Sequence, residues 1–532
     1  MNNLGEIFKK EENETINQVI MFYCLVLLSI GLPSSRFLVS VAQILIVINW
    51  VAEGSIKRKM KDFVSNKPVF FFCSTYFVFV IGLLWSGDLA HGLDFDLKNK
   101  LPFLTFPLVL ATSIPLSRKR VLALPLFFSS AVFVVSIIGA YIFFTNQYVD
   151  TRLLSPFTVH IHYGLMVLFA IFILPWSMKN LNVGKFWMFI ALIVSGWLLV
   201  FLFLLSSLIV FASLGVVVVY LFVKLFFDRK EITFKAIIAS GFLIMVVASL
   251  LILRMIVTPL FSINDEFPQN THKITEYGSK YDFKLDWSQR ENGYLVGAYI
   301  AEDELREAWN EISSFDFDGL DINGNEIKAT IYRFFASRGL KKDRLSLSQL
   351  TDTEIEAIEN GVANHLYLKW PRFMGRIHQS LWEIQQYYLT GNPNGHSLSQ
   401  RFELWRASAY AIQKYPLFGW GTGGVLKGLE YGLDKMNSQL QNRMMRPHNQ
   451  FLVFIMMVGV VGTLLIILAI TNFLVKTKAL RFFPARILAL IIFVAMLGDV
   501  PFDYQMGINF SLFFLMYFAI IYPQIVSSEQ VA

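Results

Sequence analysis

Long apolar runs alternate with short polar connections over most of this 532-residue chain. A membrane-spanning helix needs about 20 predominantly apolar residues, and about twelve runs meet that requirement, some of them short or closely paired. The pattern predicts an all-α polytopic membrane protein with about nine helices in residues 1–257, a mostly helical polar insert in residues 258–447, and about three helices in residues 448–532. The runs are centred near Val26, Ile44, Phe77, Pro107, Val132, Leu168, Val194, Gly215, Ile244, Gly462, Ile491 and Phe514.

Basic residues occur in alternate connections between these runs. Lysine and arginine concentrate in cytoplasmic loops, so we expect these connections, and both chain termini, to face the cytoplasm. The other connections, such as GDLAHGLDFDL and PFDYQMG, are acidic or nearly neutral. The same rule predicts that the insert lies outside the cytoplasm, against the outer ends of the helices. The basic clusters are Lys57-Arg58-Lys59, Arg118-Lys119-Arg120, Lys179 with Lys185, Arg229-Lys230, and Lys476 with Lys478.

The composition supports the membrane class and excludes some kinds of site. Hydrophobic residues make up 55% of the chain and charged residues only 16%. The basic cytoplasmic connections account for the net charge of +7, so a nucleic-acid partner is not predicted. Cys24 and Cys73 both lie in apolar runs, which leaves no disulfide framework and no cysteine metal site. Asp316, Asp318 and Asp321 lack the spacing of a calcium loop and predict a turn instead, so no metal site is expected.

The candidate chemistry concentrates where a polar segment meets a long apolar run. RFELWRASAYAIQKYPLFGWGTGG begins at Arg401, and RPHNQFLVFIMMVGVVGTL begins at Arg446. His448 stands at the aqueous end of the second stretch, where a neutral imidazole can accept a proton from a sugar hydroxyl. Asn449 can fix the imidazole by hydrogen bonding. The alternative is a histidine that only anchors the chain at the membrane interface.

Arg401 is the second catalytic candidate. Arg401, Trp405 and Ser408 recur at helical spacing, while Arg406 points elsewhere. A guanidinium fork matches a phosphate or diphosphate in both geometry and charge. The alternative is an amphipathic helix whose basic residues are simply solvated.

Four further residues are candidate substrate contacts. Arg254 lies near the outer end of a predicted membrane helix, where it is costly unless it snorkels or meets an anion. His162, at the outer mouth of another helix, can line the entry of an anionic substrate or serve as an interfacial anchor. Arg446 directly precedes the Pro-His pair. Gly421 belongs to a GxGxxG pattern with no preceding strand, so we expect a tight turn beside a lipid headgroup rather than a dinucleotide site.

The two stretches resemble the signature region of the O-antigen ligase superfamily, which also contains O-antigen polymerases and bacterial protein O-oligosaccharyltransferases. ENGYLVGAYIAEDELREAWNEISSF also looks like the insert of one ligase-like branch. The resemblance implies a C-type glycosyltransferase-like fold and an inverting transfer, without metal or cofactor, of a glycan from undecaprenyl diphosphate to an acceptor hydroxyl. It places this reaction at the periplasmic face of the bacterial inner membrane. His448 matches the family's essential histidine, Asn449 its partner, and Arg401 the arginine that engages the donor diphosphate.

One departure from the family pattern concerns a further arginine in the first half. The corresponding stretch FLLSSLIVFASLG has Ser206 and Ser207 but no arginine. His162, Arg254 and Arg446 are the candidates to replace it on the diphosphate.

Within the family, ligation to lipid A-core in lipopolysaccharide biosynthesis is the leading interpretation, ahead of polymerisation and protein O-glycosylation. The alternatives from other classes are a glycolipid transporter and an inactive scaffold. A transporter is expected to place ionisable residues near the bilayer midplane and to show repeated halves. Here these residues cluster at the outer rim and no repeat is seen, which favours an enzyme.

Overall fold

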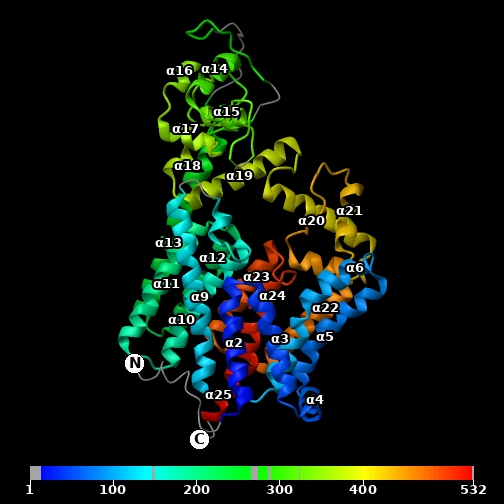
Figure 1. The fold of residues 1–532 in the computed structure, drawn as a ribbon. Helices are drawn as coiled ribbons and strands as arrows, with labels where there is room; N and C mark the ends of the chain where they lie inside the picture. The colour runs from blue at the N-terminus through cyan, green and yellow to red at the C-terminus, as the bar shows by residue number, and fades with distance from the viewer. Residues whose placement is uncertain (1–13, 147–149, 265–273, 285–288, 323, 530–532) are drawn as a thin grey trace. The chain divides into compact units, whose positions relative to one another are not determined.

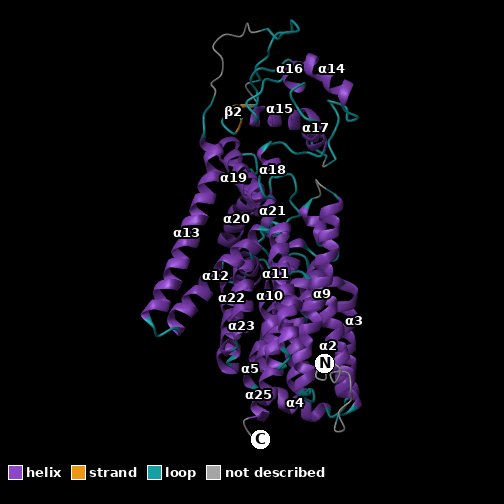
Figure 2. Cartoon of the chain, turned by 90° about the vertical axis from the view of Figure 1, so that its left-hand side faces the viewer, coloured by secondary structure: helices purple, strands orange, loops and turns teal. Residues whose placement is uncertain are grey.

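The computed structural model describes residues 14–146, 150–264, 274–284, 289–322 and 324–529. Contacts within the chain divide it into two compact units. The first unit comprises Met1–Val223 and Pro393–Ala532, and the second comprises Lys224–Asn392. Helices make up most of both units, as Figure 2 shows.

The first unit contains most of the long apolar helices and ends with α25. In Figure 1 these helices run between the end where α4 and α25 lie and the end where α6 and α21 lie. The helices are α2 (Ile16–Ser34), α3 (Arg36–Ala52), α4 (Ile56–Ser65), α5 (Lys67–Gly82), α6 (Leu89–His91), α7 (Lys98–Lys100), α8 (Pro102–Thr112), α9 (Arg118–Thr145), α10 (His160–Asn180), α11 (Lys185–Leu205), α12 (Leu208–Asp228, which continues into the second unit), α20 (Ser397–Lys414), α21 (Val425–Lys435), α22 (Gln450–Thr477), α23 (Phe483–Gly498), α24 (Gln505–Met516) and α25 (Tyr522–Glu529).

Nine helices among the described residues are long and apolar enough to cross a membrane, and the bent pair α3–α4 raises the number to ten. The predicted all-α polytopic class is therefore confirmed. Several runs that contribute to the sequence count of about twelve form short elements, such as α8 and the 16-residue α23. Local signals fix where helices begin: Thr15 and Gln18 form a capping box at α2, and Asn66 caps α5 ahead of a proline.

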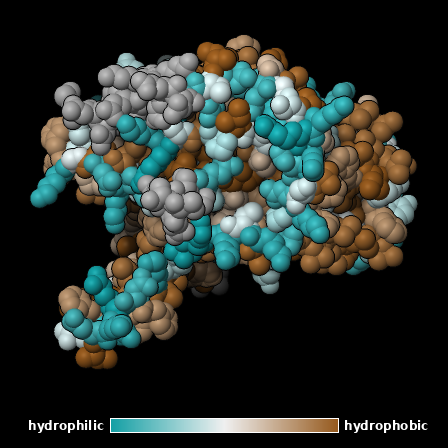
Figure 3. Space-filling view, turned by 90° about the horizontal axis from the view of Figure 1, so that it is seen from below, coloured by the Kyte–Doolittle hydropathy of each residue, from teal (hydrophilic) through white to brown (hydrophobic). Residues whose placement is uncertain are grey.

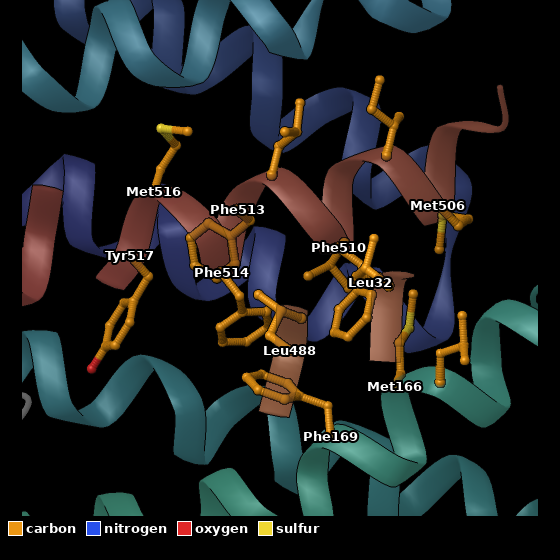
Figure 4. Close-up of a cluster of buried hydrophobic side chains, with 14 of the residues drawn as sticks. Leu32, Met166, Phe169, Leu488, Met506, Phe510, Phe513, Phe514, Met516 and Tyr517 are labelled. Atoms are coloured by element: carbon orange, nitrogen blue, oxygen red, sulfur yellow. The ribbon is translucent and has the colours of Figure 1, made fainter. Parts of the chain in front are cut away.

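The core of the first unit surrounds α24. Figure 4 shows Phe510, Phe513 and Phe514 of this helix among side chains from its neighbours. The ring of Phe514 lies 4.7 Å from that of Phe128 and 4.9 Å from that of Phe169, both in edge-on contact. In packed interiors, truncating such a phenylalanine to alanine costs about 3–5 kcal/mol. Tight aromatic packing therefore holds together helices that carry the site at their ends.

Polar and apolar side chains divide as a membrane protein requires. Viewed from below, hydrophilic side chains gather over the central part of this face, and apolar side chains dominate its right-hand edge (Figure 3). Large exposed apolar side chains such as Phe144 and Phe186 lie on the membrane helices α9 and α11. Such exposure is expected where lipid, rather than water, covers the helices.

The second unit combines one membrane-type helix with a small core of its own. Trp309, Tyr332 and Phe335 are fully buried in that core. A Thr351–Glu354 capping box begins the helix α17 in this unit. The elements are α13 (Ile232–Phe261), β1 (Arg290–Glu291) paired antiparallel with β2 (Tyr294–Leu295), α14 (Glu302–Ile312), α15 (Ile327–Ser337), α16 (Arg344–Leu347), α17 (Asp352–Glu359), α18 (Leu366–Lys369) and α19 (Arg372–Thr390).

Candidate functional site

The site is built on the polar segment that leads into α22. Asn449 caps this helix, because its Oδ1 accepts hydrogen bonds from the backbone N–H groups of Phe451 (3.1 Å) and Leu452 (3.2 Å). Its Nδ2 donates to the carbonyl of Leu497 at the end of α23 (3.1 Å). We expected Asn449 to fix the imidazole of His448; its side chain instead fixes the start of the helix that follows.

Arg446 is clamped between two carboxylates from distant parts of the chain. Its guanidinium donates to Asp96 at 2.7 Å and to Asp503 at 2.5 Å. Lys100 adds a second cation, 3.1 Å from Asp503 and 3.6 Å from Asp96. His91 lies 3.2 Å from the same guanidinium. Four formal charges of balanced sign thus join the loop before α22 to the segment before α8 and the loop before α24.

Burial sets the electrostatics of this clamp. Burial alone lowers the pKa of Arg446, but Asp503 and Asp96 outweigh it and hold that pKa above its usual range. Burial alone raises the pKa of Asp503, but Lys100 and Arg446 outweigh it and hold that pKa below its usual range. Arg446 and Asp503 therefore both stay charged near neutral pH. The guanidinium predicted to contact substrate is therefore already bonded to two carboxylates.

Gln450 ties the first turn of α22 to the same loop. Its Oε1 accepts from the backbone N–H of Phe502 at 2.8 Å, and its Nε2 donates to Asp503 at 3.2 Å. The residues on both sides of His448 and Asn449 are therefore fixed by the loop between α23 and α24. This rigid frame positions His448.

His448 shares one carboxylate with a second histidine. The Nδ1 atom of His448 lies 3.4 Å from Oδ1 of Asp499, and the Nε2 atom of His162 lies 3.4 Å from Oδ2 of the same carboxylate. The His162–Asp499 contact is close enough for an ion pair but is not aligned as a hydrogen bond. Neither Nε2 of His162 nor Oδ2 of Asp499 has a hydrogen-bond partner among the described residues. His162 is 1% exposed and His448 is 24% exposed. Only His448 is open to an incoming group.

The arrangement suits His448 as a base, because Asp499 fixes the orientation of its imidazole through Nδ1. Burial alone raises the pKa of Asp499, but the close contacts with the imidazoles of His162 and His448 outweigh it and hold that pKa well below its usual range. An ionised carboxylate on Nδ1 favours the tautomer with its proton there, leaving Nε2 of His448 free to accept one. His448 also has a left-handed backbone, with φ of 48°, which is uncommon for a residue with a side chain.

The helix that carries Arg401 is anchored beside His448. Trp405 of α20 donates from Nε1 to the carbonyl of Pro447, the residue before His448, at 2.6 Å. Arg401 precedes Trp405 by four residues and lies on the same face of the helix. The structure thus brings the predicted arginine to the side of α20 that faces the His448 segment.

The glycine-rich loop after α20 is a packing device. Gly421 has φ of +83°, and a Cβ there would lie 2.6 Å from the Cα of Ser86. The N–H of Gly423 donates to Asp96 at 3.0 Å, which joins this loop to the Arg446 clamp. Gly421, predicted to turn beside a headgroup, does make a tight turn, and its close neighbour is protein backbone.

The same loop completes a break in α22. Gly459 has φ of 69° and ψ of −177°, so the helix is interrupted there. The N–H of Val460 donates to the carbonyl of Pro416 at 2.9 Å, and that of Trp420 donates to the carbonyl of Met456 at 2.7 Å. Broken backbone inside a membrane helix needs such partners. The break therefore locks α22 against the segment that follows α20.

The remaining candidate, Arg254, lies on α13 of the second unit, whereas His448, Asp499 and His162 belong to the first. The structure thus assembles His448, His162 and Arg446 around one loop of the first unit, and Arg254 belongs to the second unit.

Sequence reasoning missed the three aspartates that organise the site. Asp96 lies in the connection GDLAHGLDFDL, and Asp499 and Asp503 lie in the loop between α23 and α24. Both connections were predicted on the outer side, together with His448. The acidic residues of the connections predicted on the outer side could have been recognised as candidate partners of His448 and Arg446, because a buried histidine or arginine needs an anionic partner.

A family model described as O-antigen ligase matches residues 366–467. The match covers Arg401, Gly421, Arg446, His448 and Asn449 and ends within α22. No curated protein matches the chain.

Proposed function

We propose, from the match of residues 366–467 to the O-antigen ligase family model, that this protein is a glycosyltransferase that moves a glycan from undecaprenyl diphosphate to an acceptor hydroxyl. The acceptor we propose is lipid A-core, which makes the protein an O-antigen ligase. The observation that carries the proposal is the partly exposed His448, which contacts Asp499 and lies on the segment to which α20, the helix of Arg401, is anchored.

The proposed reaction is a single displacement. Nε2 of His448 accepts the proton of the acceptor hydroxyl as its oxygen attacks the anomeric carbon of the donor. The bond from that carbon to the diphosphate oxygen breaks with inversion, and undecaprenyl diphosphate leaves. Arg401 contacts the diphosphate, where charge grows as this bond breaks, so a fixed guanidinium stabilises the transition state more than the ground state. The cation in this proposal is an arginine, and no metal or cofactor takes part.

The proposed location is the bacterial inner membrane, with both termini cytoplasmic and the insert and site periplasmic. Two features support it. The basic segment of α4 lies at one end of the first unit, and α6 with α21 lies at the other (Figure 1). The site includes His91 of α6, so it lies at the end opposite the predicted cytoplasmic one. In this proposal the polar insert is separated from the membrane helices at residues 257/258 and 447/448.

The test uses a strain of the source organism that lacks this gene, complemented at matched expression with the wild type, His448→Ala or Arg401→Ala. Arg406→Ala is the matched control, because Arg406 lies on the same helix with an exposed side chain. Lipopolysaccharide is run on a gel beside a blot for carrier-linked glycan. We expect His448→Ala and Arg401→Ala to lose the long-chain ladder and to accumulate full-length glycan on the carrier.

Other outcomes would overturn parts of the proposal. Single repeat units on the core would identify a polymerase. An unchanged ladder with a loss of glycoprotein bands would identify a protein O-oligosaccharyltransferase. A ladder and glycoproteins unaffected by His448→Ala would remove the enzymatic role altogether. Arg401→Lys keeps the charge but loses the bidentate fork, so unchanged donor use would argue against the role given to Arg401.

A further inference from the structure

Arg254 is an isolated cation on an apolar helix. The 30 residues of α13 include only two charged side chains, Lys235 and Arg254, and no carboxylate. Within the described residues the guanidinium of Arg254 has no hydrogen-bond or ion-pair partner, and its side chain is exposed. A charge on a membrane helix is costly without an anion or water. The missing partner must come from outside the described chain.

The position of Arg254 along α13 corresponds to the level of lipid phosphates. A span of about 20 residues crosses the hydrocarbon core, so a helix that enters at Ile232 leaves it near residue 252. Arg254 follows directly, about 10 Å before the end of the helix at Phe261. Hydrocarbon thus lies on one side of Arg254 and headgroups on the other.

A groove of about 430 Å³ surrounds this arginine, within the second unit. Trp370 lines the groove and packs against His378 of α19, with ring centroids 5.6 Å apart. The indole N–H has no hydrogen-bond partner among the described residues. Tryptophan at this depth is typical of the headgroup level. The groove is lined by Leu251, Arg254, Met255, Thr258, Pro259 and Trp370.

The segment that carries Trp370 has a positive net charge. Residues 361–376, which carry Trp370, contain no aspartate or glutamate, while Lys369 and Arg372 stand on either side of the tryptophan. The helices α13 and α19 are also tied together, because Gln385 donates to the carbonyl of Leu260 at 3.1 Å. The groove therefore combines a guanidinium, an indole N–H and apolar side chains, next to a positively charged segment.

We propose that Arg254 and Trp370 bind the phosphate group of a membrane lipid, with its hydrocarbon chain against Leu251 and Met255. Guanidinium and indole N–H groups both donate to phosphate oxygens, and arginine does so in bidentate geometry. This site lies in the second unit and takes no part in the transfer at His448. Its ligand is a phosphate carried on a hydrocarbon chain, of either the isoprenoid or the glycerolipid class.

The test measures lipid binding by native mass spectrometry of the full-length protein in detergent. The protein is titrated with phosphatidylglycerol and diacylglycerol of the same acyl chains, and with undecaprenyl phosphate and undecaprenol. We expect each phosphate lipid to bind more tightly than its phosphate-free counterpart, and Arg254→Gln to weaken phosphate-lipid binding about tenfold, the loss of one charge-assisted contact. Arg254→Lys should fall between them. The tighter of the two phosphate lipids identifies the natural class.

Two variants serve as controls. Lys235→Gln removes the other cation of the same helix, away from the groove, and should bind as the wild type does. His448→Ala should also bind normally, so a failure of the transfer proposal leaves this one intact. Equal lipid binding by Arg254→Gln and the wild type would overturn the site. So would complete displacement of the lipid by inorganic phosphate at the lipid's own concentration, since the hydrocarbon chain would then contribute nothing.

Discussion

Asp499 faces Nδ1 of His448 at 3.4 Å, across 51 residues of chain. The same carboxylate faces the buried His162, so one anion orients the exposed imidazole and also anchors it to α10. Hydrogen bonds at catalytic groups are often long before substrate arrives. The Asp499–His448 pair therefore has the geometry of a base held ready for its substrate.

The first prediction concerns Asp499→Asn. We expect the transfer rate constant to fall about 10²-fold while the KM for donor changes little, because the amide no longer favours the required imidazole tautomer. The measurement is single-turnover transfer by purified protein. Asp94→Asn is the control, since Asp94 is an exposed aspartate near the same end of the molecule. An unaltered rate constant would show that Asp499 does not act through His448.

The second prediction tests whether Arg446 is structural. Arg446→Met leaves Asp96 and Asp503 buried with Lys100 alone, and removing one partner of a buried ion pair costs about 3–5 kcal/mol. We expect a lower apparent midpoint of thermal unfolding in detergent. Adding Asp503→Asn restores charge balance and should recover part of the loss. If Arg446 instead contacts the donor, Arg446→Met would keep its midpoint and raise the KM for donor.

The third prediction concerns the break in α22. A Cβ on Gly459 would lie 2.1 Å from the carbonyl oxygen of Leu417, at a φ of +69°. Gly459→Ala should therefore lower stability by more than about 1 kcal/mol and loosen the segment after α20. Gly215→Ala is the matched control, because a Cβ there meets nothing within 4 Å. Equal midpoints of thermal unfolding for the two variants would contradict the described break.

The fourth prediction is a pH dependence in the second unit. Burial, with the charge of Arg333, lowers the pKa of His378 to about 4. The unfolded chain binds this proton below about pH 6.5, whereas the folded chain binds it only near pH 4. The contribution of the neutral His378 to stability is therefore complete above about pH 6.5. This contribution should decrease as the pH falls from about 6.5 to 4, by about 3 kcal/mol in total. Hydrogen exchange of α19 at pH 7 and pH 5 measures it.

The control for this pH effect is His378→Gln, which cannot take up a proton. Its exchange rates, corrected for the intrinsic pH dependence of exchange, should differ less between the two pH values than those of the wild type. If wild type and variant show the same pH sensitivity, another group is responsible.

The sequence predicts the class of this protein and one part of its site. Apolar runs are a local property, so the polytopic all-α fold was predictable, and so was the capping box at Thr351. His448 and Arg401 belong to one continuous stretch, which made them recognisable. In the sequence, Asp96 and Asp503 look like ordinary acidic residues of connections. Their partner Arg446 is 350 residues from Asp96 and 57 residues from Asp503.

Gly459 illustrates a second limit. Glycine in an apolar run predicts close helix packing, and nothing in the run itself shows that the helix breaks there. The break depends on the carbonyls of Pro416 and Leu417, which tertiary structure brings alongside.

Hydropathy also does not show which segments pack into one compact unit. The helices α20 and α21 belong to the polar insert predicted from hydropathy, yet they pack within the first unit.

The Arg446 clamp also sets a time at which the protein can begin to work. Asp96 is synthesised early, yet its guanidinium partner follows 350 residues later and the second carboxylate 57 residues after that. Until then a nascent chain holds an incomplete ion cluster and a histidine without its aspartate. The ion cluster and the Asp499–His448 pair are therefore completed only after most of the chain has been synthesised.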